Sequence, residues 1–199
     1  RGIDYELIDF CIRTGRLYES YPHHNAVFVG KDKDGQPRYA CLRGIGTDFK
    51  GEATGSDKRF SFSIPAEESS QVLYLFESAI DLLSFAAMAQ EDRLPWRSQH
   101  LLSLAGVYQP KKNLTERHLP LALSQYLRDH REIQTIYLCL DNDLAGRSAA
   151  DAIRQQLAGR YVVLDGFPCQ GKDYNDWLCL RKGLPITRTV SKPERSMAR

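Results

Sequence analysis

The sequence lacks an apolar run long enough to cross a membrane. A membrane-spanning helix needs roughly 18 or more consecutive apolar residues, and the 199 residues contain no such run. A secretory signal is also absent. We therefore expect a protein without membrane attachment and with a cytoplasmic location. The chain begins at Arg1 rather than Met, which suggests a segment of a longer protein.

The sequence also has few cysteines and a small net charge. The five cysteines are odd in number and no two form a CxxC pair, which argues against a zinc-binding framework and a disulfide scaffold. We expect reduced thiols, several of them in the core. The net charge of +2 is too small to demonstrate nucleic-acid binding, but Lys and Arg cluster in residues 31–59 and again from residue 181 onward.

Residues 1–68 have the pattern of a small α+β unit. Apolar residues spaced for one helical face predict a helix over residues 3–14. Strand-like segments at 25–30 and 37–44 flank an Asp- and Gly-containing turn, which predicts a hairpin. Residues 58–65 alternate Phe with Ser and predict a half-buried strand, whereas the Gly-rich segment 45–57 predicts a mobile loop.

Residues 69–182 change to alternating buried strands and helices. The predicted strands are 72–77, 101–106, 136–140 and 160–167, and the predicted helices are 79–89, 114–128, 144–157 and 173–181. Short connections between such elements favour a parallel sheet covered by helices on both faces, an α/β fold. Residues 183–199 are basic and lack an apolar period, so we expect a flexible tail.

Acidic residues follow several of these strands. Glu77 closes the first, Asp141 and Asp143 follow the third, and Asp173 and Asp176 come after the last. Parallel strands end at one edge of the sheet, so these carboxylates should converge. An all-oxygen set without His or Cys suits Mg²⁺ or Mn²⁺ and phosphoryl or nucleotidyl transfer. Alternatively, Asp141 merely ends its strand and Asp143 caps the following helix.

These residues resemble the Toprim domain, which topoisomerases, bacterial replicative primases and some nucleases share. The matching elements are Glu77 after a strand, the run Asp141–Gly146 (DNDLAG), the strand end Ser103–Gly106 and the segment Gly171–Asp173, over about residues 70–180. The resemblance implies that Glu77 is a metal ligand or general acid/base, that Asp141 and Asp143 are metal ligands, and that Asp173 begins the last acidic motif. Primases usually have Asp-Xaa-Asp there, whereas this chain has Asn175, with Asp176 displaced by one position. This departure leaves the second metal position open between Asn175 and Asp176.

The chain as a whole resembles the primase-like Toprim proteins of bacterial plasmids and conjugative transposons. The segment from Asn25 to Gly44 is similar to a primase segment that precedes the Toprim module. By this analogy, Arg43, Lys58 and Arg59 hold nucleotide or template phosphates; the alternative is that they are solvated charges of turns and strand edges. Lys172 either contacts phosphate or neutralises the acids.

The resemblance implies a metal-dependent nucleic-acid enzyme. Primase-type nucleotidyl transfer on single-stranded DNA would use two Mg²⁺ (or Mn²⁺) ions and nucleoside triphosphates, in a mobile element and alongside other replication or transfer proteins. A Toprim nuclease would use the same acids to activate water. A third hypothesis is a non-catalytic DNA-binding or docking module of a plasmid replication or transfer complex.

Overall fold

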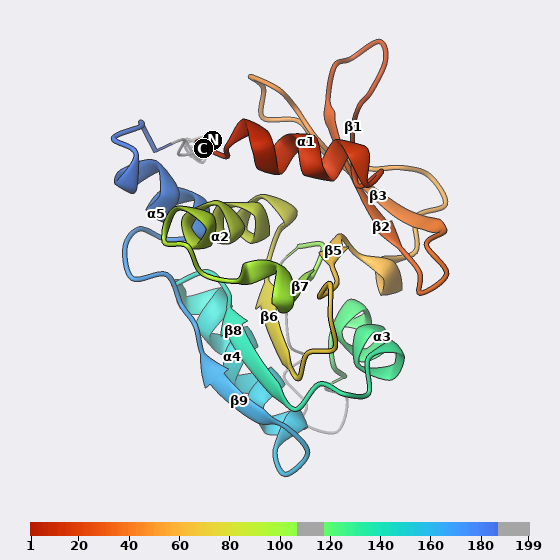
Figure 1. The fold of residues 1–199 in the computed structure, drawn as a ribbon, viewed down its shortest axis with the longest axis vertical. Helices are drawn as coiled ribbons and strands as arrows, with labels where there is room; N and C mark the ends of the chain where they lie inside the picture. Colours follow the sequence, from red (N-terminus) through yellow and green to blue (C-terminus); the bar gives the residue numbers. More distant parts are fainter. Residues whose placement is uncertain (107–117, 187–199) are drawn as a thin grey trace, which may run out of the picture.

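A computed structural model describes residues 1–106 and 118–186 of the chain (Figure 1). It contains a small antiparallel sheet of four strands and a larger sheet of five strands flanked by helices, which confirms the α/β class and both kinds of sheet. No helix within the described ranges is both long and apolar enough to span a membrane.

The small sheet follows the first helix. The elements are α1 (Tyr5–Arg13), β1 (Leu17–Glu19), β2 (Ala26–Lys31), β3 (Pro37–Arg43) and β4 (Lys50–Glu52), with strand order β1-β2-β3-β4. The predicted hairpin joins β2 and β3: the Asp32 carbonyl accepts the Gly35 N–H at 3.0 Å, and Gly35 has a φ of +78°, which glycine adopts without strain. The prediction of a mobile loop over 45–57 is wrong in its centre, because β4 pairs there with β3.

The prediction of one strand over 58–65 is also wrong. Lys58–Phe60 form a 3₁₀ turn, η1, because the Asp57 carboxylate accepts the Arg59 N–H at 3.0 Å and so caps it. Only β5 (Ser63–Ile64) is a strand, and it joins the larger sheet antiparallel to β7 (His100–Ser103). Ser61 is buried, and its hydroxyl lies 3.0 Å from that of Ser103.

The larger sheet has the order β5-β7-β6-β8-β9 and is parallel except at β5. Its other strands are β6 (Val72–Phe76), β8 (Thr135–Cys139) and β9 (Val162–Asp165). Its helices are α2 (Ala79–Glu91), α3 (Leu121–Asp129), α4 (Leu144–Leu157) and α5 (Tyr174–Arg181), with a 3₁₀ turn η2 at Trp96–Ser98. The predicted helix over 114–128 begins only at Leu121, and its residues 114–117 lie outside the described ranges, as do residues 187–199 of the predicted tail.

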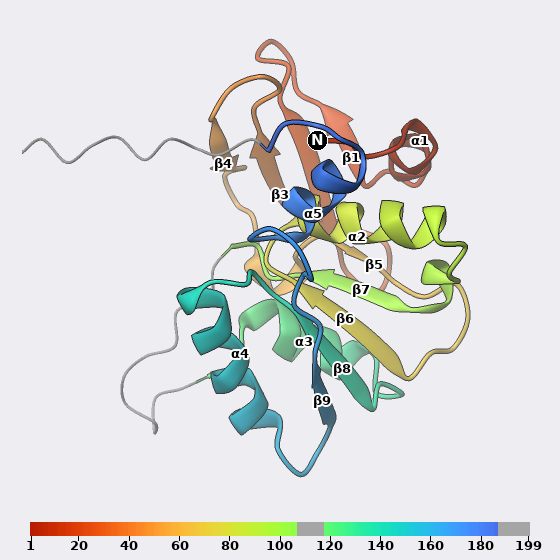
Figure 2. The same ribbon diagram turned by 90° about the vertical axis from the view of Figure 1, so that its left-hand side faces the viewer.

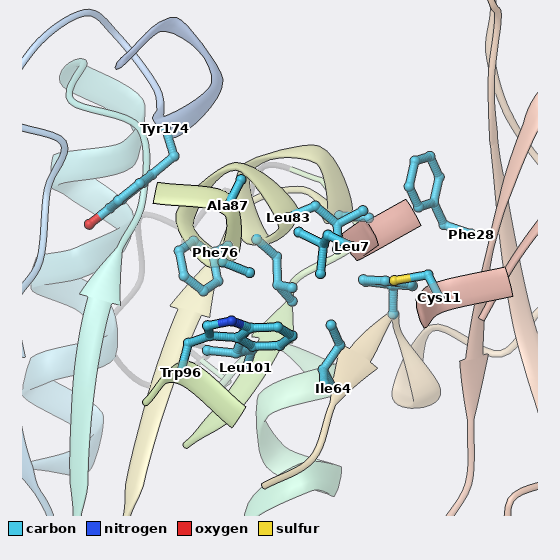
Figure 3. Close-up of a cluster of buried hydrophobic side chains, with 14 of the residues drawn as sticks. Leu7, Cys11, Phe28, Ile64, Phe76, Leu83, Ala87, Trp96, Leu101 and Tyr174 are labelled. Carbon is cyan, nitrogen blue, oxygen red and sulfur yellow. The ribbon is translucent and has the colours of Figure 1, made fainter. Parts of the chain in front are cut away.

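Helices cover both faces of the larger sheet (Figure 2). One core lies between the sheet and α3 and α4. The other lies between the sheet and α2, and it continues without a break to α1 and the small sheet. Figure 3 shows this continuity, with Tyr174 and Phe76 toward one end, Leu83 beside Leu7 in the middle, and Cys11 and Phe28 at the other end. The two sheets therefore share a core, and the division of the chain at residues 68 and 69 stays a prediction.

Candidate active site

Glu77 and Asp141 meet at the carboxyl-terminal edge of the parallel strands. β6 and β8 are neighbours in register, with Phe76 opposite Cys139, so the residues that follow them are brought together. The Glu77 side chain is buried, with 6% of the residue exposed, and its Oε1 accepts the backbone N–H of Asp141 at 3.3 Å. We call Glu77, Asp141, Asp143 and Asp173 the acid edge.

The side chain of Asp143 can both cap a helix and bind a cation, so the capping and metal-ligand interpretations of this residue are compatible. Its Oδ1 accepts the Gly146 N–H at 2.9 Å and so caps α4. Its Oδ2 lies 3.1 Å from the ammonium group of Lys172. One oxygen therefore stabilises the helix while the other stays available to a cation.

Lys172 lies between the two aspartates. Its Nζ is 3.0 Å from Oδ2 of Asp141 and 3.1 Å from Oδ2 of Asp143. Its backbone carbonyl accepts the N–H of Asn142 at 2.7 Å, which ties the loop before α5 to the loop after β8. Both carboxylates thus converge on one point that already attracts a positive charge.

The ionisation of these carboxyl groups differs because their surroundings differ. Burial, reinforced by the charge of Asp141, raises the pKa of Glu77 to about 7. Burial also raises the pKa of Asp141, although Lys172 opposes the shift. The Gly146 N–H lowers the pKa of Asp143, which is therefore the most readily ionised of the three. The fraction of Glu77 that is protonated near neutral pH therefore depends on the positive charge close to its carboxyl group.

The last acidic motif begins at Asp173, which caps α5. Its Oδ1 accepts the N–H of Asp176 at 2.7 Å, and burial raises the pKa of its carboxyl group. The carboxylate of Asp176 accepts the N–H of Lys172 at 3.1 Å and so braces the loop that carries Lys172. Asn175 faces elsewhere: its buried amide donates to the Arg1 carbonyl at 2.7 Å and to the Ser84 hydroxyl at 3.0 Å. Asn175 therefore holds the chain start and α2 together.

Asp81 lies beside the acid edge and was missed by the sequence analysis. It is 7% exposed, accepts the Ser78 hydroxyl at 2.5 Å and accepts the Asn175 N–H at 3.3 Å. Burial, together with the charge of Asp173, raises its pKa to about 7. The available signal was its place one helical turn after Glu77, within a Ser-Xaa-Xaa-Asp start of the helix. Asp81 links the strand end that carries Glu77 to the start of α5.

The donor atoms at the acid edge are of the chemical type that a hard divalent cation prefers, although the structure does not place three of these carboxylates within 4.8 Å of one another. They are carboxylate oxygens. Burial raises the pKa of the carboxyl groups of Glu77, Asp141 and Asp173, so ionising these groups together requires added positive charge. The ammonium of Lys172 between Asp141 and Asp143 supplies part of that charge in the protein alone. Oxygen-only donors favour Mg²⁺ or Mn²⁺ over Zn²⁺.

The structure does not bring Arg43, Lys58 and Arg59 into any described contact with the acid edge. Arg43 ends β3 and donates to the Leu42 carbonyl at 2.9 Å. Lys58 lies 3.0 Å from Glu52, and Arg59 lies 2.6 Å from Asp57. Lys58 and Arg59 are thus paired with carboxylates, and a phosphate-binding role would require these ion pairs to be exchanged, whereas Arg43 donates only to a neutral carbonyl.

Two family models match the chain. A model described as Toprim-like matches residues 74–178, which include the acid edge. A model described as a protein of unknown function, DUF3991, matches residues 1–69, which include the small sheet.

Known proteins are similar over nearly the whole chain. A 65 kDa protein of Zymomonas mobilis is 27% identical over an alignment 198 positions long, which covers 94% of this chain and 31% of that protein. The primase fragment of the bacteriophage T7 primase-helicase is 21% identical with a TM-score of 0.59, over 92% of this chain and 67% of the other. A DnaG primase catalytic domain bound to ssDNA is 15% identical with a TM-score of 0.52, over 92% and 57% of the two chains. At these identities the solved structures establish a shared fold.

Proposed function

The chain belongs to the Toprim-like family, and from that premise we propose that it is a metal-dependent nucleic-acid enzyme domain that performs primase-type nucleotidyl transfer on single-stranded DNA. The observation that carries the proposal is the convergence of Asp141 and Asp143 on one cation position beside the buried Glu77. The shared fold with primase catalytic domains supports the reaction type.

Glu77, Asp141, Asp143 and Asp173 would hold one or two Mg²⁺ or Mn²⁺ ions. Such ions polarise phosphoryl oxygens and stabilise the negative charge of an in-line displacement. Asp143 would offer Oδ2 while its Oδ1 keeps α4 capped, so the ligand is held rigidly by the helix it starts. Asp176 would act through the Lys172 backbone as a positioning residue.

Glu77 would act as the general base that accepts the proton of the attacking hydroxyl group. Its Oε1 is fixed by the Asp141 N–H, and a pKa of about 7 places its carboxyl group between the charged and neutral forms at the working pH. A general base is most effective when its pKa lies near the operating pH. A cation nearby would favour the carboxylate, the form that can accept a proton.

Lys172 would exchange its partners during the reaction. A cation between Asp141 and Asp143 would displace the ammonium, which could then contact a triphosphate oxygen. Arg43, Lys58 and Arg59 would hold the template by its phosphates. Because phosphate contacts release bound counterions, template affinity should fall steeply with salt.

The proposed function also involves partner proteins and segments outside this chain. The chain spans 31% of the length of its Zymomonas relative, so other segments of such a protein would contribute to its activity. One solved structure with a similar chain shows the bacteriophage T7 lagging-strand DNA polymerase interacting with primase domains bound to an RNA/DNA hybrid and dTTP. We propose that replication or transfer proteins of a mobile element are partners of this chain, with a boundary between its two units near residue 68.

One gel assay tests the reaction. The chain is incubated with labelled single-stranded DNA and four ribonucleotides, with and without Mg²⁺ or Mn²⁺. Products that grow only with metal and disappear in Asp141→Asn support the proposal. Asp151→Asn is the matched control, because Asp151 lies on the exposed side of α4 and pairs with Arg154 at 2.7 Å.

The other outcomes identify the alternatives. Metal-dependent shortening of the DNA would replace nucleotidyl transfer with nuclease activity at the same acids. DNA retardation without any product, with wild type and Asp141→Asn alike, would favour a non-catalytic binding module.

A further inference from the structure

Three polar side chains meet at the edge of the larger sheet opposite the acid edge. His100 begins β7, His130 directly follows α3, and Glu132 lies in the turn that leads to β8. β7 and β8 are parallel to the β6 strand between them, so their first residues lie together at the amino-terminal edge. The acid edge, in contrast, lies at the carboxyl-terminal ends of β6 and β8.

The distances within this group fit one small cation. Glu132 Oε1 lies 3.5 Å from Nε2 of His100 and 3.3 Å from Nδ1 of His130. One donor atom from each residue lies within 4.8 Å of the others. Four ligands around a tetrahedral zinc ion with bonds of about 2.0–2.1 Å are separated by about 3.3 Å. Two of the separations therefore already match a metal site.

His100 supplies a second and independent observation. The residue is 2% exposed, and its Nε2 makes no hydrogen bond with any residue that the structure describes. Its other ring nitrogen lies 3.0 Å from the hydroxyl of Tyr126, a contact that holds the ring in place. A buried polar atom without a partner is costly, and most such atoms in folded proteins have one. This nitrogen faces the Glu132 carboxylate.

We propose that His100, His130 and Glu132 form a second metal site, which binds Zn²⁺ and is separate from the acid edge. Two imidazole nitrogens and one carboxylate oxygen are a donor set typical of zinc, whereas magnesium prefers oxygen alone. In the structure Nδ1 of His100 accepts the Ala66 N–H at 3.4 Å. With metal on Nε2, Nδ1 would carry the proton and donate it to the Tyr126 hydroxyl instead, the kind of outer contact that orients ligating histidines. The ion would tie the turn between α3 and β8 to the start of β7.

Accessibility and charge agree with this assignment. The side chains of His130 and Glu132 are 23% and 36% exposed, so an ion can enter from solvent although His100 is buried. The carboxylate supplies the negative charge that offsets the ion.

The test is a titration of the whole chain with Zn²⁺ by calorimetry, in excess Mg²⁺ to occupy the acid edge. We expect one Zn²⁺ bound per chain at this site. His130→Gln and Glu132→Gln should each weaken the affinity for Zn²⁺ by about 10- to 100-fold or more. Losses of about 10- to 100-fold are typical when only an outer contact of a metal ligand is removed, and here a ligand itself is removed. Both positions are partly exposed, and circular dichroism verifies that both variants fold.

Two controls localise the ion. His24→Gln alters an exposed pair of the same chemistry, in which His24 lies 2.9 Å from Glu19, and should leave the affinity unchanged. Asp141→Asn should also leave it unchanged. Absence of Zn²⁺ binding, full affinity in both His130→Gln and Glu132→Gln, or loss of binding in Asp141→Asn would overturn the proposal.

Discussion

The backbone carbonyl of Asp141 and the α-carbon of Gly146 approach so closely that a Cβ at position 146 would lie 2.1 Å from the carbonyl oxygen. The same Cβ would lie 3.0 Å from Oε1 of Glu77. The first turn of α4 can therefore pack against the end of β8 only because residue 146 is glycine. The contact holds Asp141, Asp143 and Glu77 in one arrangement.

Gly146→Ala should disrupt this arrangement. Either α4 or the Asp141 loop must move, since a backbone oxygen cannot yield as a flexible side chain does. We expect a loss of about 1–3 kcal/mol in the free energy of unfolding, the usual cost of overpacking, together with weaker Mn²⁺ binding. Urea unfolding and a Mn²⁺ titration measure the two effects. Ser148→Ala, at an exposed position of the same helix, is the control, and equal behaviour of the two variants would contradict the assignment.

Glu77→Gln should abolish catalysis without harming the fold. The amide keeps the size of the side chain and its acceptor for the Asp141 N–H, but it cannot take a proton. If Glu77 is the general base, the rate of product formation in the gel assay should fall on the order of 10²- to 10⁴-fold. Unfolding at pH 8 should show stability equal to or greater than wild type, because the amide carries no buried charge. Full activity of Glu77→Gln would remove Glu77 from the mechanism.

Lys172→Met should bind Mn²⁺ more tightly than wild type. The ammonium competes with the metal for Asp141 and Asp143, and its two partly exposed ion pairs are each worth about 0.2–1 kcal/mol. Removing this competition corresponds to a gain of roughly 2- to 30-fold in affinity. Calorimetry measures the change, and Lys182→Met, which loses ion pairs with Asp4 and Glu91 instead, is the matched control. Weaker binding in Lys172→Met alone would mean that Lys172 supports the metal site and does not compete for it.

Asp81→Asn should alter the pH dependence of stability. The folded-state pKa of about 7 lies above the ordinary value of 3.8, so between these values the folded protein keeps a proton that the unfolded chain has released. The ionisation of Asp81 therefore lowers stability as pH rises from about 4 to 7 and has its full effect above 7. The amide removes this effect, so the variant should gain on wild type by up to about 4 kcal/mol at pH 8 and by little at pH 4.

Urea unfolding of the metal-free protein at pH 4, 6 and 8 measures the difference between the two proteins. Asp151→Asn is the control for removal of an exposed carboxylate, and its free energy of unfolding should equal that of wild type at all three pH values. A difference between Asp81→Asn and wild type that does not change with pH would show that Asp81 ionises as an ordinary surface carboxyl.

Local sequence signals determined much of the framework of the larger sheet. The helix predicted over 144–157 has those bounds in the structure, because Asp143 caps its start within three residues of sequence. The hairpin at Asp32–Gly35 was equally predictable, since a turn depends on the conformations of its own residues. The order of strand ends in a parallel sheet was sufficient to predict that Glu77 and Asp141 approach one another, whereas Asp173 lies at the start of α5, eight residues after β9 ends.

Contacts between distant segments decided the rest. Residues 58–65 alternate like one strand, yet the Asp57 cap and the burial of Ser61 against Ser103 divide them into a turn and a short strand of the other sheet. Asp81 and Asn175 look like ordinary helix residues until α2 and α5 pack together and bring them within hydrogen-bonding distance. His100 and Glu132 are equally inconspicuous, because only the parallel pairing of β7 and β8 with β6 places the start of β7 and the turn before β8 at one edge. Sequence encodes local conformational preference directly, whereas the environment of a buried polar group exists only once the chain has folded around it.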